Sequence, residues 1–148
     1  MKNKAKVVVI GGGVVGVSTL YHLAKKGWSD VVLCERKELT SGSTWHAAGL
    51  MPLFNMSYSV GQIHKYSVKF YQELEKETGQ DVGFREVSNI RLAENQDRMD
   101  EYRQYAGVAE TIGVKVNFLT PEEVQKAWPL CSIEGLVGSI QHPEDGYI

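Results

Sequence analysis

The sequence predicts an α/β fold that begins with a Rossmann-type β-α-β unit and continues into the start of an α+β domain. Three observations predict it: a β-branched run enters a glycine cluster, a helical pattern follows, and a second apolar run ends in an acid. Because doubly wound sheets usually have about five or six strands, we expect the 148 residues to be the N-terminal part of a longer two-domain protein. The expected domains are residues 1–50 and a truncated second domain at 51–148.

Residues 1–50 contain the β-α-β unit. Lys6–Ile10 (KVVVI) predicts a buried, parallel strand, and Val31–Cys34 (VVLC) predicts a second one. Val14–Lys26 predicts the connecting helix, with Gly27 in the C′ position behind it. The residues expected to face inward from this helix are Leu20, Leu23 and Ala24.

Residues 51–148 alternate between helical and strand patterns. The expected elements are a helix at Val60–Thr78, a strand at Asn89–Ala93, a helix at Gln96–Ile112, a strand at Val114–Leu119, a helix from Thr120 and a strand at Leu136–Gln141. Gly79 and Gly113 follow the two longer helices as caps. Thr120 and Glu123 have the spacing of a capping box. The expected packed faces are Ile63, Tyr66, Phe70 and Leu74 in the first long helix and Met99, Tyr102, Ala106 and Ala109 in the second.

Composition and charge are those of an ordinary globular protein: 43% hydrophobic, 23% charged, net charge −2. Interleaved acids and bases argue against a nucleic-acid or membrane partner. The first apolar run is too short for a signal peptide, and no segment approaches the ~20 apolar residues of a membrane span. We therefore expect a cytoplasmic location, with the mitochondrial matrix as the alternative for a mature chain. HExxH and CxxC spacings are missing from the sequence, so no metal site is expected.

The segment GGGVVG matches the dinucleotide-binding pattern GxGxxG. Gly11 permits a tight turn, Gly13 lets the backbone approach a pyrophosphate, and Gly16 lets the helix pack closely. Glu35 ends the next strand about 20 residues on, where a carboxylate binds a ribose diol and disfavours NADP. The expected contacts are Gly11, Gly13, Val14, Val15, Gly16 and Glu35, with Arg36 either at the adenosine part or on the surface.

The β-α-β unit by itself leaves FAD and NAD open, because both cofactors contain an ADP half. The next segment, TSGSTWHAAGL at Thr40–Leu50 and here called the TWH loop, favours FAD, since an NAD site does not need it. Its small residues allow backbone to approach a flat ring, and its N–H and hydroxyl groups suit a diphosphate or ribityl chain. The expected cofactor contacts in the loop are Gly42, Ser43, Thr44, Trp45, His46, Ala47, Ala48, Gly49 and Leu50.

Four stretches, ERKELTSGSTWHAAGL, YQELEKETGQDVGF, NIRLAENQDRMDEY and HPEDGYI, resemble the N-terminal part of the dimethylglycine dehydrogenase and sarcosine dehydrogenase family. The resemblance extends over essentially the whole chain. It implies a flavoprotein of the D-amino-acid-oxidase type, with an FAD domain joined to a mostly antiparallel substrate domain. In that family the His of STWHAAG carries the flavin covalently on its 8α-methyl carbon. Carried over, this residue is His46, and Trp45 would be a packing neighbour.

The resemblance also implies a reaction and partners. The reaction is FAD-dependent oxidative N-demethylation of dimethylglycine or a sarcosine-like amine, through an iminium that hydrolyses or passes its carbon to tetrahydrofolate. An electron-transfer flavoprotein or oxygen would accept the electrons. Catalytic residues and any tetrahydrofolate site would lie beyond Ile148, so the fragment alone is expected to be inactive.

Two other functions stay open. One is a non-catalytic, regulatory relative that binds FAD or a nucleotide; the Trp-His pair of the TWH loop favours the enzyme over it. The other is a nicotinamide-linked Rossmann dehydrogenase, against which the same loop argues. Bound yellow flavin would exclude the second alternative.

Overall fold

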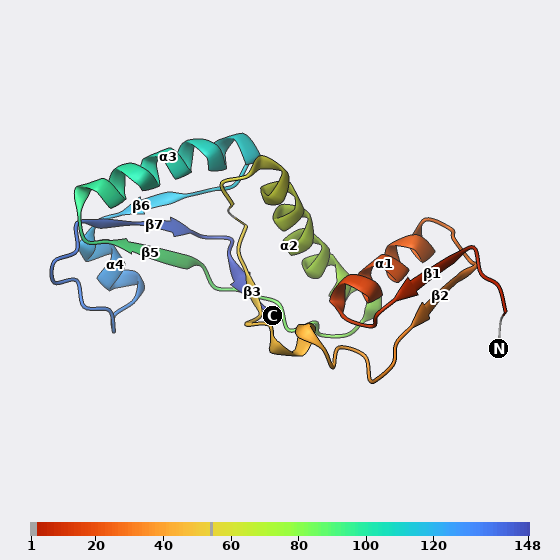
Figure 1. Ribbon diagram of the computed structural model, residues 1–148. Helices are drawn as coiled ribbons and strands as arrows, with labels where there is room; N and C mark the ends of the chain where they lie inside the picture. Colours follow the sequence, from red (N-terminus) through yellow and green to blue (C-terminus); the bar gives the residue numbers. More distant parts are fainter. Residues whose placement is uncertain (1–2, 54) are drawn as a thin grey trace. The chain divides into compact units, whose positions relative to one another are not determined.

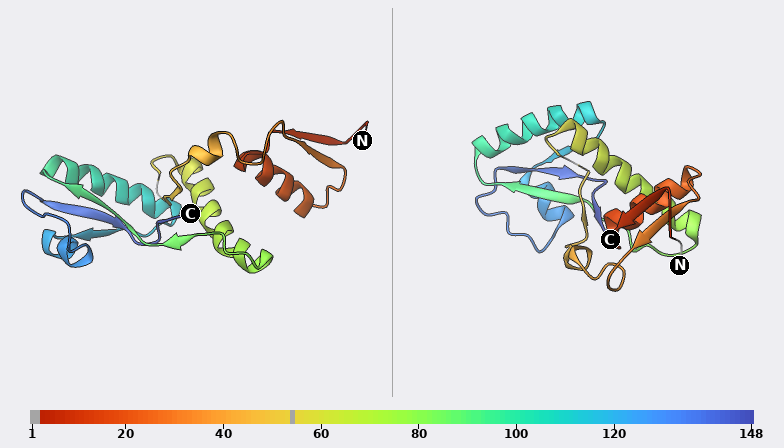
Figure 2. Two further views of the ribbon diagram at one scale, coloured as in Figure 1. Left: turned by 90° about the horizontal axis from the view of Figure 1, so that it is seen from below. Right: turned by 45° about the vertical axis from the view of Figure 1, so that its right-hand side comes forward.

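The computed structural model describes residues 3–53 and 55–148 (Figures 1 and 2). The chain forms two compact units, Met1–Ala48 and Gly49–Ile148, which are described separately below. The division falls two residues before the expected one at residue 50. Gly49 belongs to the second unit because its carbonyl accepts a hydrogen bond from the Ile148 N–H at 2.8 Å.

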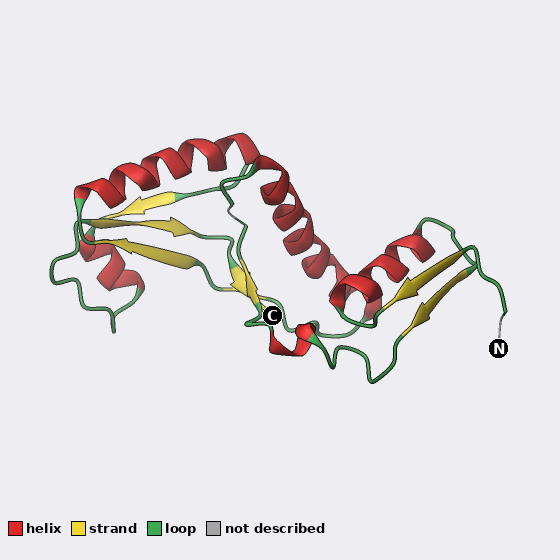
Figure 3. Ribbon diagram, viewed as in Figure 1, coloured by secondary structure: helices red, strands yellow, loops and turns green. Residues whose placement is uncertain are grey.

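The first unit is a β-α-β arrangement followed by one short turn of helix (Figure 3). Strands β1 (Val7–Ile10) and β2 (Val31–Cys34) pair in parallel, with Val7 opposite Val31 and Ile10 opposite Cys34. Helix α1 (Val14–Lys25) connects them, and Gly27 follows it at φ +85°. The TWH loop contains a 3₁₀ turn, η1 (Ser43–His46), that the sequence did not predict.

The expected burial of the first unit is partly wrong. Val8 is 53% exposed and Ile10 86% exposed, so β1 is not a buried strand. Leu20 and Leu23 of α1 are half-buried, whereas Ala24 is exposed. Two strands and one helix leave one face of this sheet without a covering layer, and alternate side chains of β1 point to that face.

The second unit contains a three-stranded antiparallel sheet in the order β5-β7-β6. Its elements are α2 (Tyr58–Thr78), β5 (Asn89–Ala93), α3 (Gln96–Ile112), β6 (Asn117–Leu119), α4 (Pro121–Ala127) and β7 (Gly138–His142). Strand β5 and helix α3 have the expected bounds. Strand β6 is shorter than expected, because the N–H of Val114 turns back to the Ala109 carbonyl and Val114 enters the core.

A second small sheet of three two-residue strands was not predicted. Its strands are β3 (Leu50–Met51), β4 (Arg85–Glu86) and β8 (Gly146–Tyr147), in the order β3-β8-β4. Each partner of β8 comes from a distant part of the chain, with Leu50 and Arg85 both opposite Tyr147. Two residues are too few to show strand periodicity, so only tertiary pairing defines these strands.

Helix α3 packs as its sequence predicts. Met99, Tyr102 and Ala109 are buried, and Ala106 is half-buried. One cluster joins α3 to the sheet through Ala93 and Ile140. The second cluster consists of Leu53, Val68, Ala109, Ile112 and Val114. The caps are also confirmed: Gly79 and Gly113 adopt φ +72° and +75°, and the capping box of α4 is complete.

The predicted packing face of α2 is wrong at two of its four residues, because Phe70 and Leu74 are half-buried but Ile63 and Tyr66 are not. Ile63 and Tyr66 are 63% and 57% exposed, whereas Gly61 and Val68 are buried. A Cβ atom at Gly61 would lie 2.6 Å from Cδ1 of Ile112. The helix therefore packs on α3 through its smallest residue, which lets α3 come close, and leaves Ile63 and Tyr66 exposed.

Candidate functional site

The glycine loop between β1 and α1 disfavours side chains, through backbone conformation at Gly11 and through lack of space at Gly13 and Gly16. Gly11 adopts φ +104°, a conformation that favours glycine. A Cβ at Gly16 would lie 1.9 Å from the Gly11 carbonyl oxygen, and a Cβ at Gly13 would lie 3.0 Å from Thr44 Oγ1. Each glycine of the GxGxxG pattern is therefore favoured for a different structural reason: its φ angle, a contact with a side chain, or a contact with the backbone. The loop leaves the N-terminus of α1 open to an anion.

Glu35 binds the same loop. Its Oε2 accepts a hydrogen bond from the Gly12 N–H at 2.6 Å, and its Oε1 accepts one from the Lys37 N–H at 2.8 Å. These two bonds, with Gly12 as the larger cause, lower the pKa of Glu35 below its usual value of 4.5. Glu35 is therefore ionised at neutral pH, as a ribose-binding carboxylate must be.

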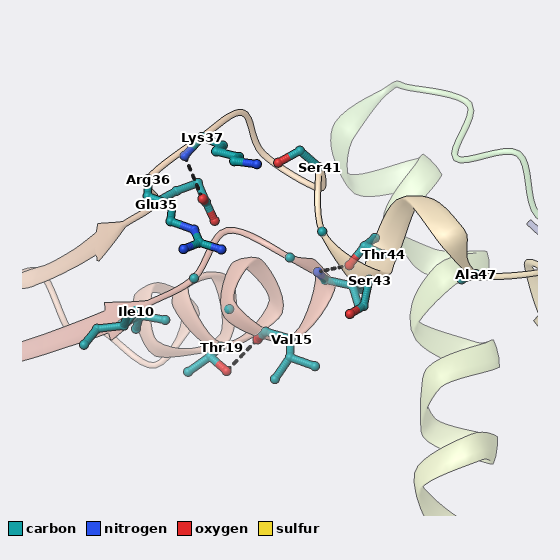
Figure 4. A pocket seen from close by; sticks show the side chains of 16 residues that line it. Ile10, Val15, Thr19, Glu35, Arg36, Lys37, Ser41, Ser43, Thr44 and Ala47 are labelled. Atoms are coloured by element: carbon teal, nitrogen blue, oxygen red, sulfur yellow. Dashed lines mark hydrogen bonds between the residues drawn. The ribbon is translucent and has the colours of Figure 1, made fainter.

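The TWH loop is attached to the glycine loop at two points. The N–H of Thr40 donates to the Gly12 carbonyl at 2.9 Å. The N–H of Val14 donates to Thr44 Oγ1 at 2.9 Å, the bond drawn at Thr44 in Figure 4. Thr40 adopts φ +65°, which costs energy for a β-branched residue. These contacts hold the TWH loop beside the N-terminus of α1.

One cavity of about 620 Å³ lies between these segments, entirely within the first unit (Figure 4). The predicted cofactor-contact residues that line it are Gly11, Gly13, Val14, Val15, Gly16, Glu35, Arg36, Gly42, Ser43, Thr44 and Ala47. Lining residues that the sequence analysis missed are Val9, Ile10, Thr19, Lys37 and Ser41. Lys37 and Ser41 could have been found from their places directly after Arg36 and before Gly42. The glycine loop, the carboxylate and the hydroxyl groups fit the ADP half of FAD.

Trp45, His46 and Ala48 are outside that lining. His46 ends η1, and its Nδ1 lies 3.0 Å from the Gly42 carbonyl oxygen. Since a carbonyl only accepts hydrogen bonds, Nδ1 carries the proton, and in the neutral ring Nε2 keeps its lone pair. Trp45 is 74% exposed, with its ring edge-on to that of His46 at 5.8 Å between centroids. The Gly42 carbonyl thus orients the His46 ring at the end of η1.

Gly49 and Leu50 lie in the second unit, where their contacts are structural. A Cβ at Gly49 would lie 2.3 Å from the Ile148 carbonyl oxygen, and Leu50 pairs with Tyr147. Cofactor contacts for both residues stay predictions.

A pair of buried polar side chains in the second unit was not predicted. His142 is 1% exposed and Asp145 is 2% exposed. Burial, and then the charge of Arg91, lowers the pKa of His142 to about 4. Burial raises the pKa of Asp145, whose Oδ1 accepts the Leu53 N–H at 2.8 Å. This bond ties the turn between β7 and β8 to the segment after β3.

Within residues 3–53 and 55–148 we find no group of three or more His, Cys, Asp or Glu side chains arranged to hold a metal ion. Over the same part of the chain, every helix is too short or too polar to cross a membrane.

A glycine loop at a helix N-terminus, an acidic residue after the next strand and a second loop on one cavity define a dinucleotide-binding oxidoreductase domain. The chain belongs to the FAD dependent oxidoreductase family, whose model matches residues 6–148. It is 44% identical to the mitochondrial dimethylglycine dehydrogenase of Rattus norvegicus and 40% identical to the mitochondrial sarcosine dehydrogenase of Homo sapiens. Each match covers 99% of this chain, but only 17% and 16% of those proteins. The mitochondrial pyruvate dehydrogenase phosphatase regulatory subunit of Mus musculus is 36% identical over 98% of this chain and 16% of its own.

The fold also matches a solved structure, that of L-proline dehydrogenase from P. horikoshii, with a TM-score of 0.91 and 26% sequence identity. The match covers 99% of this chain and 38% of that one. It confirms the predicted fold class. The family favours FAD over NAD as the cofactor.

Proposed function

We propose that this chain is the FAD-binding N-terminal part of a flavoenzyme that oxidatively demethylates an N-methylated glycine. The observation that carries the proposal is one cavity of the first unit that is lined by both the glycine loop and the TWH loop. Similarity to dimethylglycine and sarcosine dehydrogenases supports the substrate class.

Two features of the first unit would each bind a different part of FAD. Glu35 would accept hydrogen bonds from the ribose diol, since it is held ionised beside the glycine loop. The diphosphate would lie at the N-terminus of α1, where Gly13 leaves the backbone accessible. Bound FAD would supply the two-electron acceptor for oxidation of the substrate's N-methyl carbon.

His46 would carry the flavin covalently. Its Nε2, which keeps the lone pair while Nδ1 donates to Gly42, would bond to the 8α-methyl carbon. The new C–N bond would replace one C–H bond of the methyl group and one N–H bond of the ring. This would release two protons and two electrons, and dioxygen would take up the electrons. The tether would hold the ring in place through many turnovers.

The remaining parts of the reaction rest on similarity. The substrate would be a small N-methylated amino acid such as dimethylglycine or sarcosine. An electron-transfer flavoprotein or oxygen would accept the electrons, and tetrahydrofolate would be bound by a part of the protein outside these residues. Because the chain spans 17% of its dimethylglycine dehydrogenase relative, we expect residues 1–148 alone to bind FAD without turnover. Relatives named as mitochondrial agree with the mitochondrial matrix more than with the cytoplasm.

A regulatory, non-catalytic role is the second candidate, because the phosphatase regulatory subunit is 36% identical to this chain. Such a protein would bind FAD or a nucleotide in the same cavity without demethylating an amine.

The test uses the full-length protein expressed with FAD available. The protein is acid-precipitated and washed, and the mass and visible spectrum of the pellet are recorded. We expect one added FAD, absent from His46→Ala and retained in the control His22→Ala, whose histidine lies on α1. Flavin in the supernatant would refute the tether but not FAD binding. Turnover of dimethylglycine or sarcosine separates the enzyme from the regulatory candidate, and no flavin in either fraction would refute both the flavoenzyme and FAD binding.

A further inference from the structure

The N-terminus of α1 receives its cap from the TWH loop. Gly13 is the N-cap residue and has no side chain to offer. The N–H of Val14, the first residue of the helix, instead donates to Thr44 Oγ1 at 2.9 Å, 30 residues further along the chain. A Cβ at Gly13 would lie 3.0 Å from the same oxygen. The Thr44 hydroxyl therefore lies directly at the start of the helix (Figure 4).

Thr44 also shares a turn with His46. Both belong to η1 (Ser43–His46), and the Thr44 carbonyl accepts the Ala47 N–H at 3.2 Å. His46 Nδ1 donates to Gly42 at 3.0 Å, within the same turn. Displacement of Thr44 therefore changes the segment that fixes the His46 ring.

The other attachment of the TWH loop uses backbone atoms only. The Thr40 N–H donates to the Gly12 carbonyl at 2.9 Å, and the Thr40 carbonyl accepts the Trp45 N–H at 3.2 Å, so no side chain of this attachment reaches the N-terminus of α1. Thr44 is two residues from His46, and its side-chain hydroxyl forms the contact with α1. A ligand at the N-terminus of α1 would therefore contact the same hydroxyl.

We propose that Thr44 is a positioning residue that couples the diphosphate end of the cavity to His46. Its hydroxyl oxygen accepts the Val14 N–H, and its proton stays available to an anion at the helix N-terminus. One hydroxyl would thus hold the turn of His46 and sense the diphosphate. The role in tethering rests on the proposed function, whereas the effect on His46 in FAD-free protein does not.

The first test measures the ring of His46 in FAD-free, full-length protein with ¹⁵N-labelled histidine. Long-range ¹⁵N–¹H spectra report which ring nitrogen carries the proton, and His46→Gln assigns the signals. We expect one tautomer, protonated at Nδ1, in the wild type and in Thr44→Ser, and a mixture in Thr44→Val, which keeps the shape but loses the hydroxyl. Ser43→Ala removes a hydroxyl from the same turn and should keep the wild-type signal. Identical signals in Thr44→Val and wild type would overturn the proposal.

A second variant removes the donor instead of the acceptor. Val14→Pro deletes the N–H at the first helical position, which proline tolerates, and Gly13 already has the extended backbone that precedes proline. It should reproduce the mixed His46 signal of Thr44→Val. In the wild type, the Val14 amide should exchange more slowly with D₂O than in Thr44→Val. An unprotected Val14 amide in the wild type would refute the contact whether or not either variant folds.

Loading with FAD separates this proposal from the tether. We expect Thr44→Val to attach FAD on the order of tenfold more slowly than the wild type, because small misplacements cost reactivity, while Thr44→Ser stays near the wild type. If wild-type His46 carries no flavin but its tautomer depends on Thr44, the tether fails and the positioning role stands. If FAD attaches at the same rate in Thr44→Val, the tether stands and the positioning role fails.

Discussion

The carboxylate of Glu35 accepts a 2.6 Å hydrogen bond from the N–H of Gly12, 23 residues earlier in the chain. The bond joins the end of β2 to the turn after β1, and Glu35, Gly11 and Gly13 all line the cavity. A backbone donor thereby keeps the carboxylate ionised and aimed at the site before any ligand arrives.

Glu35→Gln keeps the shape of this side chain but removes its charge. We expect ADP to bind on the order of tenfold more weakly, because charge-assisted hydrogen bonds are the stronger ones. Calorimetric titration at pH 7 measures the affinity, and the exposed Glu38→Gln is the matched control. The pKa of Glu35 is lowered in the fold, so its contribution to stability is present above pH 4.5 and is lost as pH falls through the lower folded value. Equal affinities of the two variants would contradict the role of Glu35.

Two glycine-to-alanine substitutions should have opposite effects. A Cβ at Gly16 would meet the Gly11 carbonyl at 1.9 Å, so Gly16→Ala must displace the glycine loop and weaken ADP binding, at a cost of ~1–3 kcal/mol in stability. Gly107 lies within α3, and a Cβ there meets no described atom within 4 Å. Gly107→Ala should stabilise the protein by about 0.5–1 kcal/mol, because alanine favours a helix. Thermal unfolding and ADP titration measure both, and intact ADP binding in Gly16→Ala would refute the explanation.

The exposed and buried faces of α2 can be compared by truncation of one residue on each. Val68→Ala should lower the free energy of unfolding of the 148-residue chain by roughly 1–3 kcal/mol, because Val68 packs with Leu53 and Ile112. Ile63→Ala should change it by less than about 0.5 kcal/mol, because the side chain is exposed. Urea unfolding curves measure both. If Ile63→Ala lowered the free energy of unfolding more than Val68→Ala, Ile63 would belong to the packed face, as the sequence predicted.

Because His142 is buried, we expect the stability of the second unit to depend on pH in the acidic range. Its pKa is lowered from 6.5 to about 4 in the fold, so between these values the unfolded chain binds a proton that the folded chain does not. Stability should therefore fall as pH decreases from 6.5 to 4, by up to roughly 3 kcal/mol from this group. The raised pKa of Asp145 acts in the opposite direction.

Urea unfolding at several pH values tests this linkage. His142→Gln should flatten the dependence of the free energy of unfolding on pH in that window, whatever its effect at pH 7. The same slope in the variant and in the wild type would show that His142 does not bind the proton on unfolding.

Local patterns predicted most elements of the fold. The bounds of β2, β5 and α3 agree with their apolar periodicity, and the capping box at Thr120 is visible in four letters of sequence. The three strands of the β3-β8-β4 sheet escaped prediction because each has two residues and gains its identity from a distant partner. The α2 error has another cause: burial of Gly61 depends on Ile112, which no local pattern can show.

The candidate site divides in the same way. Sequence alone determined the glycine loop, Glu35 and the TWH loop, because glycine conformations, strand ends and small-residue runs are local properties of the chain. Only the tertiary structure decided that Thr44 caps α1, that Gly12 binds Glu35 and that His142 is buried. The first two contacts join residues 23 or more positions apart, and the burial of His142 depends on segments distant in sequence. Local patterns cannot show either, because both form only when the chain closes loops of this length.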